Sequence, residues 1–220
     1  EADEITGTDG SDSIRSYDQN DTLYGGAGND YMDGGWHRDL MYGGAGNDAM
    51  YSHSGADTMY GGDGADFMLG HSSTSIIDSE GVEMMYGGND NDIMYGADYV
   101  RSELYGGDGK DYIHTEDGTD DLLDGGAGND ELIAVRGNDT LIGGSGDDVM
   151  RASRGENLLI SGIGNDTVSL NYGPDTIQFG EDDVFSFSAT VVKFFDEEEG
   201  DIGPTHRPLG PVAGEELHGV

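Results

Sequence analysis

The sequence of 220 residues contains no cysteine, four prolines and only nine lysines and arginines. Without cysteine, the chain has no disulfide framework and no zinc site built on thiolates. With 40 glycines but so few prolines, a collagen-like chain is excluded. The shortage of basic residues excludes nucleic acid as a natural partner, since phosphate binding needs a positively charged surface. No apolar run approaches the ~18 residues of a membrane span, so no transmembrane segment is expected.

Acidic residues are abundant instead, and 46 Asp and Glu give the chain a formal net charge of −37. Such a density of like charge normally favours a disordered chain, because the residues repel one another and leave little apolar surface for a core. A folded structure is expected only if cations neutralise the carboxylates.

A nine-residue repeat covers residues 7–178, with Gly25 taken as its first position. Positions one to six are rich in glycine and predict a turn, because glycine accepts left-handed backbone conformations. Positions seven to nine predict a short strand, in which only position eight faces the core. Position eight is apolar at Ile14, Leu23, Met32, Met41, Met50, Met59, Met68, Met85, Met94, Leu104, Ile113, Leu122, Leu132, Leu141, Met150, Leu159, Val168 and Ile177. Strands this short must stack to share hydrogen bonds and bury one apolar column.

The repeat GGxGxDxUx, in which U is a bulky apolar residue, resembles the nonapeptide of the RTX (repeats in toxin) calcium-binding β-rolls. Copies that follow it include GGAGNDYMD, GGAGNDAMY, GGDGADFML and GGAGNDELI. The resemblance implies an all-β fold, a parallel β-roll solenoid with two sheets and calcium-binding turns. It also implies Ca²⁺ as cofactor and export by a type I secretion system. One coil of the roll takes two repeats, so successive turns alternate between two edges.

The repeat is interrupted between Gly70 and Tyr86, either by two short repeats or by one repeat with an insertion near 71–79. In the one-repeat interpretation, which we favour, the best glycine-rich turns all lie on one edge, here called the first edge. Position nine of one sheet is then a column of large residues, which would be scrambled in the two-repeat interpretation. That column is Tyr24, Tyr42, Tyr60, Tyr86, Tyr105, Leu123, Ile142 and Ile160.

Position six of the first-edge turns supplies the candidate calcium ligands. Calcium takes six to eight oxygen ligands from carboxylates and carbonyls, and two stacked turns can each provide half of such a shell. About nine first-edge turns therefore predict about eight ions. The candidate ligands are Asp12, Asp30, Asp48, Asp66, Asp90, Asp92, Asp111, Asp130, Asp148 and Asp166.

The second edge departs from the repeat at positions one to four, as in GGWHRD at 34–39, and calcium is not assigned to it. It nevertheless keeps a position-six carboxylate at Asp21, Asp39, Asp57, Asp120 and Asp139. A histidine metal site at His37, His53 and His71 is a weaker interpretation than three surface histidines.

The tyrosine column is expected to point outward. Simple cross-strand packing explains it most easily, but stacked aromatics could also bind a polysaccharide, another domain or a second copy of the chain. The candidate ligand-binding residues are Tyr24, Tyr42, Tyr60, Tyr86 and Tyr105.

Beyond the repeats, residues 184–187 and 190–195 have strand propensity and are interpreted as a cap over the open core. This divides the chain into a β-roll at 1–178 and a cap with an acidic, Pro- and Gly-containing tail at 179–220. Zinc-protease and serine-hydrolase motifs are absent from the sequence, so the chain is predicted not to be an enzyme. We expect a structural calcium-binding module of a secreted or cell-surface protein, which folds on binding calcium. The alternatives are a carbohydrate- or surface-binding module and a self-assembling surface-layer or filament protein.

Overall fold

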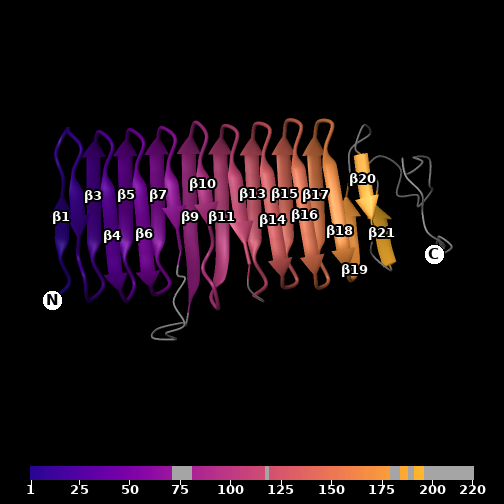
Figure 1. Ribbon diagram of the computed structural model, residues 1–220, viewed down its shortest axis with the longest axis horizontal. Coiled ribbons are helices and arrows are strands. Elements are labelled where there is room, and N and C mark those ends of the chain that lie inside the picture. Colours follow the sequence, from indigo (N-terminus) through magenta and orange to yellow (C-terminus); the bar gives the residue numbers. More distant parts are fainter. Residues whose placement is uncertain (71–80, 117–118, 179–183, 188–190, 196–220) are drawn as a thin grey trace.

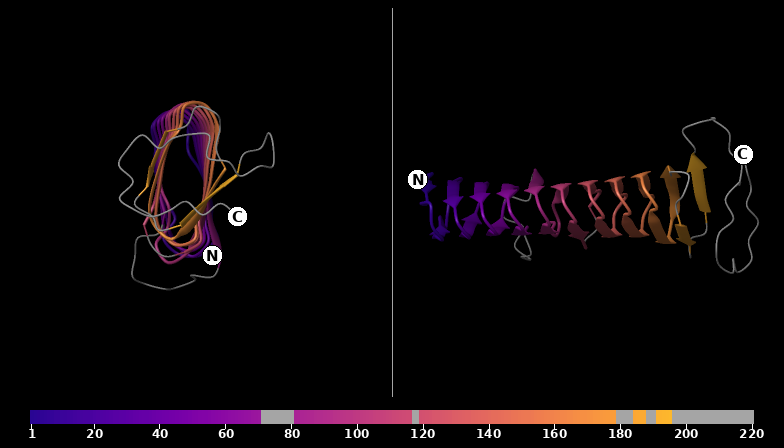
Figure 2. Two further views of the ribbon diagram at one scale, coloured as in Figure 1. Left: turned by 90° about the vertical axis from the view of Figure 1, so that its right-hand side faces the viewer. Right: turned by 90° about the horizontal axis from the view of Figure 1, so that it is seen from above.

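The computed structural model describes residues 1–70, 81–116 and 119–178 in full, together with the backbone of 184–187 and 191–195 (Figure 1). The described chain is a flattened solenoid in which two sheets face each other across a narrow interior (Figure 2). These residues form strands and turns without any helix, and so include no helical segment able to cross a membrane. The all-β parallel roll predicted from the repeat is confirmed.

The odd-numbered strands form an 11-stranded sheet, here called sheet A. Its strands are β1 (Glu4–Thr6), β3 (Thr22–Ala27), β5 (Leu40–Ala45), β7 (Thr58–Asp63), β9 (Val82–Asn89), β11 (Arg101–Asp108), β13 (Leu122–Ala127), β15 (Thr140–Ser145), β17 (Leu158–Ile163), β19 (Pro174–Gln178) and β21 (Val191–Phe195).

The even-numbered strands form a 10-stranded sheet, here called sheet B. Its strands are β2 (Ser13–Arg15), β4 (Tyr31–Trp36), β6 (Ala49–Ser54), β8 (Phe67–Leu69), β10 (Ile93–Tyr95), β12 (Tyr112–Thr115), β14 (Glu131–Arg136), β16 (Val149–Arg154), β18 (Thr167–Tyr172) and β20 (Val184–Phe187). First-edge turns lead from sheet A to sheet B, and second-edge turns lead back.

Most strands are longer than the three residues that the repeat predicted, because they continue into the first glycines of the next turn. Gly26 pairs with Gly44 in the parallel register of β3 and β5. Gly44 has φ of 114°, and a Cβ built on it would lie 2.1 Å from the carbonyl oxygen of Gly26. Position two is therefore glycine both for its conformation and for the close approach of the neighbouring coil.

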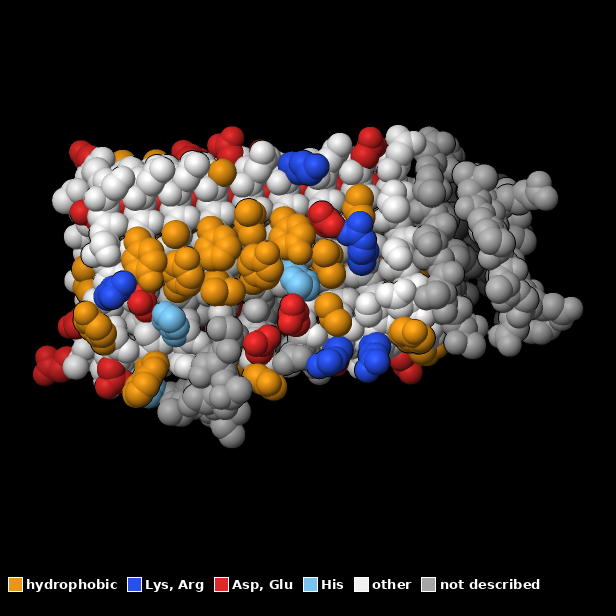
Figure 3. Space-filling model, in the orientation of Figure 1, with side chains coloured by type: hydrophobic (Ala, Val, Ile, Leu, Met, Phe, Trp, Pro, Cys, Tyr) orange, Lys and Arg blue, Asp and Glu red, His pale blue; other side chains and the backbone are white. Residues whose placement is uncertain are grey.

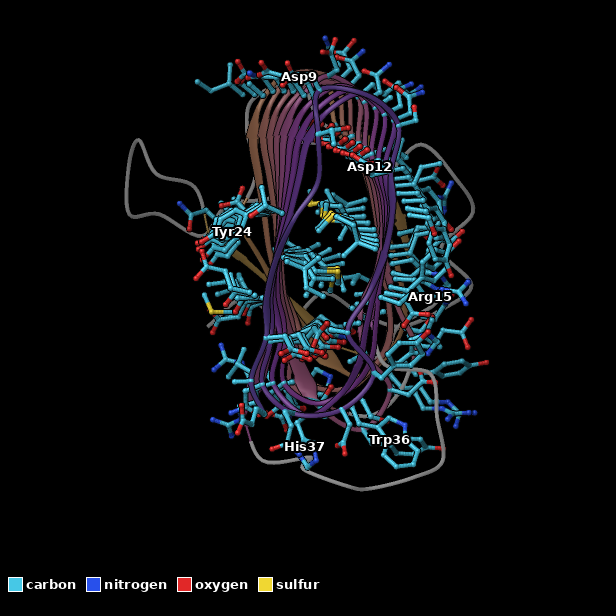
Figure 4. The ribbon with its side chains drawn as sticks, turned by 90° about the vertical axis from the view of Figure 1, so that its left-hand side faces the viewer. Asp9, Asp12, Arg15, Tyr24, Trp36 and His37 are labelled. Carbon is cyan, nitrogen blue, oxygen red and sulfur yellow. The ribbon has the colours of Figure 1, made fainter. Side chains whose placement is uncertain are left out.

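Position eight forms the core, as predicted. Leu23, Met41 and Ile177 are fully buried, like the other position-eight residues between them, and Figure 4 shows methionine sulfur atoms in the interior. One assignment was wrong by a single residue. Leu123, not Leu122, faces the core and pairs with Leu104 and Leu141.

The same shift places Asp124, not Leu123, opposite Tyr105 in the tyrosine column. The coil that ends there is 19 residues long instead of 18, as its hydrogen bond from Asp111 to Asp130 shows. The pairing of the strands fixes their register, so the extra residue is absorbed in the second-edge turn before position six.

Beyond residues 71–80, β9 resumes beside β7 with Tyr86 opposite Tyr60 and Met85 opposite Met59. This is the register of the one-repeat interpretation. The expected insertion at 71–79, including His71, and the tail at 196–220 lie outside the described residues. The division of the chain at residue 178 stays a prediction.

The two strands predicted after the repeats add one further coil. β20 pairs with β18, and β21 pairs with β19, both in parallel register. They stand over the coil whose core residues are Val168, Leu170 and Ile177, each fully buried.

We therefore expect truncation after Gly180 to weaken calcium-driven folding or to cause aggregation, because it exposes the edges of β18 and β19. Truncation after Gly200 removes only residues 201–220 of the tail and should leave folding unchanged. Circular dichroism during calcium titration, with light scattering, measures both effects. Identical titrations of the shorter chain and the full chain would contradict a capping role.

Candidate metal centre

A row of buried aspartates runs along the inside of the first edge, at position six of successive turns. The row is Asp30, Asp48, Asp66, Asp92, Asp111, Asp130, Asp148 and Asp166, and its members are between 0% and 3% exposed. Figure 4 shows carboxylate oxygens gathered inside this edge, near Asp12. One oxygen of each carboxylate has a defined partner. For example, the backbone N–H of Asp30 donates to Asp48 Oδ1 at 2.8 Å, and that of Asp130 donates to Asp148 Oδ1 at 2.8 Å.

The second oxygen of each carboxylate in this row, Oδ2, is buried and has no hydrogen-bond partner. A buried charged oxygen without a partner is strongly unfavourable. The eight atoms repeat from coil to coil, so they form one continuous row of unsatisfied acceptors.

All of these Oδ2 atoms except that of Asp166 face a small space that a glycine leaves open. A Cβ built on Gly43 would lie 2.4 Å from Asp48 Oδ2 and 2.7 Å from the carbonyl oxygen of Gly61 in the next coil. The equivalent pair of oxygens, a carboxylate Oδ2 and a carbonyl of the next coil, lies beside Gly25 and beside Gly61. A carboxylate oxygen and a backbone carbonyl thus converge on the same point, and this is the donor chemistry that calcium prefers.

No three His, Asp or Glu side chains converge on a common metal position among the described residues. A cation on the first edge must therefore take much of its shell from backbone carbonyls. The glycine-rich turns can provide these carbonyls, so the residues fit a hard divalent cation.

Without a cation, ionisation of the buried aspartates in this row is energetically unfavourable. Burial, together with the charges of Asp66 and Asp111, raises the pKa of Asp92 to about 8. Burial likewise raises the pKa of Asp66 and of Asp148 to about 7. A bound cation would favour the ionised form at these positions.

The family described as the RTX calcium-binding nonapeptide repeat (4 copies) matches residues 1–32, 33–68, 79–98, 102–122, 124–159 and 133–168. The chain belongs to this RTX family. RTX repeats bind calcium, so Ca²⁺ is the cation that the first edge fits. A comparison with curated proteins finds none that matches the chain.

Two of the ten candidate ligands of this RTX roll differ from the rest. Asp12 is half-buried in the first coil, and its Oδ2 already accepts hydrogen bonds from the N–H and the hydroxyl of Thr8. Asp90 has the left-handed backbone expected at position four, with φ of 74°, but its side chain is exposed and lies outside the inner row.

The second edge of the RTX roll also carries buried carboxylates at position six. They are Asp21, Asp39, Asp57, Glu83, Asp121, Asp139 and Asp175, with Ser102 and Asn157 between them. The assignment of Asp120 to position six was wrong, because Asp120 is exposed and Asp121 occupies the buried position. Sequence reasoning missed Glu83, although it precedes Met85 by two residues just as Asp57 precedes Met59.

Position one distinguishes the two edges. Along the first edge it is glycine in nearly every coil. Along the second edge it runs Ser16, Gly34, Ser52, Gly70, Gly96, Thr115, Ala134, Ala152 and Leu170. The last three are fully buried and belong to the hydrophobic core. In these C-terminal coils of the second edge, carbon atoms fill the space that lies open beside Gly43 and its first-edge equivalents.

The five tyrosines of the column on sheet A stack on one another, with neighbouring ring centroids 4.8–5.1 Å apart and planes within 6° of parallel. Because each ring face is turned toward the next ring, a ligand would meet mainly ring edges and hydroxyl groups. Cross-strand packing accounts for this geometry. Ligand binding by Tyr24, Tyr42, Tyr60, Tyr86 and Tyr105 stays a prediction.

A second aromatic row, missed in the sequence, crosses the outer face of sheet B and appears as the hydrophobic patch in Figure 3. It comprises Tyr31, Tyr51, Phe67, Tyr95 and Tyr112, with neighbouring rings tilted by 34–55°. These residues alternate between positions seven and nine, so no single column of the repeat reveals them.

The glycine at position one gives a direct test of the cation space. Gly43→Ala should weaken calcium-driven folding, because its methyl group would meet Asp48 Oδ2 and the carbonyl of Gly61. Forcing a methyl group into a packed site costs about 1–3 kcal/mol. Gly10→Ala is the control, since its nearest neighbour would be Thr8 Oγ1 at 3.9 Å. The midpoint of calcium titration should rise for the first variant and stay unchanged for the second; equal midpoints would contradict the assigned cation space.

Proposed function

We propose that this RTX chain is a calcium-dependent structural module of a secreted or cell-surface protein, and that calcium binding drives its folding. The observation that carries the proposal is the row of buried Oδ2 atoms without partners on the first edge. All of them but that of Asp166 lie beside a backbone carbonyl of the next coil. The proposal assigns no enzymatic activity to the chain.

The proposed ligands are the position-six carboxylates and the carbonyls of the glycine-rich turns on either side of each ion. Asp30, Asp48, Asp66, Asp92, Asp111, Asp130, Asp148 and Asp166 would contribute Oδ2, and Asp12 and Asp90 lie at the margin of the row. About one ion between each pair of stacked turns gives about eight ions. About eight divalent ions would bring the net charge from −37 to about −21.

Folding and binding are coupled in this proposal because two halves of each site come from different coils. The unfolded chain holds no complete site, so calcium binds the folded roll preferentially and stabilises it. Members of the RTX family are typically exported by type I systems. Outside the cell calcium is plentiful, and this is where the acidic chain would fold.

The first test is the calcium dependence of folding and its distribution between the edges. Calcium added to the chelated chain should raise the β signal in circular dichroism cooperatively, while magnesium should act poorly because it retains its water ligands. Asp130→Asn should raise the calcium midpoint, since it keeps an acceptor for the N–H of Asp111 but removes a ligand charge. Losing one ion present at 100 times its Kd removes about 2.7 kcal/mol.

Asp139→Asn is the matched control, because it lies beside Ala134 and because Asn157 naturally occupies the equivalent place one coil later. The calcium midpoint of folding for Asp139→Asn should match that of the unmodified chain. A chelated chain that is already fully folded, or equal midpoints for the two variants, would refute the proposal.

The second test uses acid instead of calcium. Burial raises the pKa of Asp66 and Asp148 to about 7 and that of Asp111 to about 6 in the folded roll, from the ordinary value of 3.8. A raised carboxyl pKa contributes stability when the group is protonated and loses that contribution as pH rises through the folded value. The chelated chain should therefore gain β structure when the pH is lowered from about 8 to about 5. Calcium should restore the signal at pH 8, and a chelated chain that is insensitive to pH would disagree with this account.

A further inference from the structure

The outer face of sheet B differs from that of sheet A in how its aromatic rings are arranged. On sheet A the planes of neighbouring tyrosine rings are within 6° of parallel, so the rings cover one another. On sheet B the neighbouring planes are tilted by 34–55°, so these rings do not lie flat against each other. Figure 3 shows broad ring surfaces along this patch. We propose that the aromatic row of sheet B binds a neutral, extended β-linked polysaccharide.

The spacing of the row matches such a chain. Successive coils are roughly 4.8 Å apart, which is close to the length of one sugar residue in an extended β-linked polysaccharide. The rings alternate between two columns, with Tyr31, Phe67 and Tyr112 at position seven and Tyr51 and Tyr95 at position nine. Sugar residues of a cellulose-type chain alternate as well, because each is turned over relative to the one before. Ring centroids 5.3–6.0 Å apart therefore provide about one ring for each sugar residue.

The chemistry of the row also suits a sugar. The C–H groups of a pyranose form an apolar face, and its hydroxyl groups lie around the rim. Tyrosine combines an apolar ring with a polar hydroxyl group. Polar side chains stand beside the rings: Asp33 Oδ1 is 3.1 Å from His53 Nε2, and His114 contacts Tyr95 and Tyr112. The rings can hold the C–H faces of the sugar while these few polar groups bind its hydroxyl groups.

The charge of this face favours a neutral ligand. At positions seven and nine of β2 to β18, the carboxylates are Asp33 and Glu131 and the arginines are Arg15 and Arg151. Arg15 pairs with Asp33, and Arg151 pairs with Glu131. The face therefore has no net charge, although the chain carries −37. A cationic ligand would prefer the acidic edges of the roll, and an anionic ligand would be repelled by the chain as a whole.

The size of the face argues against a second copy of the chain as the occupant. From β4 to β12 the row measures roughly 20 Å along the roll by roughly 10 Å across three residues, which is roughly 200 Å². A stable protein interface buries about 800 Å² on each partner. Two copies would also bring together two chains of charge −37, which repel each other. A linear polysaccharide needs only this narrow strip.

Isothermal titration calorimetry of the full, calcium-loaded chain tests the proposal. The probes are cellohexaose and chitohexaose, with maltohexaose as an α-linked control that is curved. At least one of the first two should bind, and maltohexaose should not. Tyr51→Leu and Tyr95→Leu should each weaken that binding roughly tenfold, because each removes one ring contact. Leucine suits this column, since Leu69 lies between the two tyrosines.

Tyr42→Leu and Tyr86→Leu are the matched controls, because each removes a sheet A tyrosine from the same coil as Tyr51 or Tyr95. Both should bind the sugar as the unmodified chain does. Circular dichroism in saturating calcium checks that every variant is folded, so failure of sugar binding is distinguishable from failure of calcium-driven folding. Phe67→Ile replaces a Leu variant that does not fold, since Ile93 is the next residue of its column.

Three results would overturn the site. The first is a folded unmodified chain that binds neither cellohexaose nor chitohexaose, or binds maltohexaose equally well. The second is equal binding by the sheet A and sheet B variants. The third is a dimer of the unmodified chain in analytical ultracentrifugation that Tyr51→Leu dissociates, because the row would then be an interface between copies.

Discussion

The hydrogen bond from one position-six N–H to the position-six carboxylate of the next coil governs the rest of the roll. On both edges this bond ties nearly every described turn to its neighbour, as between Asp48 and Asp66 or between Asp21 and Asp39. It needs only one oxygen, and Asn157 provides that oxygen as well as aspartate does. Aspartate at position six therefore has two separable roles: Oδ1 joins adjacent coils, and Oδ2 remains for a cation.

Whether a cation can bind beside Oδ2 depends on which residue occupies position one of the same turn. Glycine leaves room for an ion and a carbonyl, whereas Ala152 and Leu170 fill the same space and extend the hydrophobic core. The two edges of one roll are thus stabilised differently, although their aspartates look alike in the sequence. Under the proposed function, the dependence of folding on calcium should accordingly come mainly from the first edge, although Asp139 and Asp175 of the second edge also keep a buried Oδ2 without a partner.

The nine-residue frame was sufficient to predict the two sheets, the core column and the tyrosine column, because the period fixes which side chains share a face. It could not locate an extra residue within a coil. For this reason Leu122 and Asp120 were assigned where the structure has Leu123 and Asp121. Glu83 was missed because the frame is lost near residues 71–79, and a glutamate does not match the repeat. The length of the strands was underestimated because glycine normally weakens a strand, whereas these glycines pair between coils.

The two halves of the roll also differ in how their cores and surfaces contribute to stability. From Met32 to Met94 the core is an unbroken column of methionines, which fill space well but specify packing poorly. From Leu104 onward the core is mostly Leu, Ile and Val, apart from Met150. The tyrosine column on sheet A and the aromatic row on sheet B cover mainly the methionine half, from Tyr24 to Tyr112. Stacked rings 4.8–5.1 Å apart match the spacing of the strands and hold them in register from outside. The tyrosine column and the aromatic row thus stabilise the coils whose methionine core specifies its packing least. Packing alone therefore explains where these aromatic residues lie, before any ligand is considered.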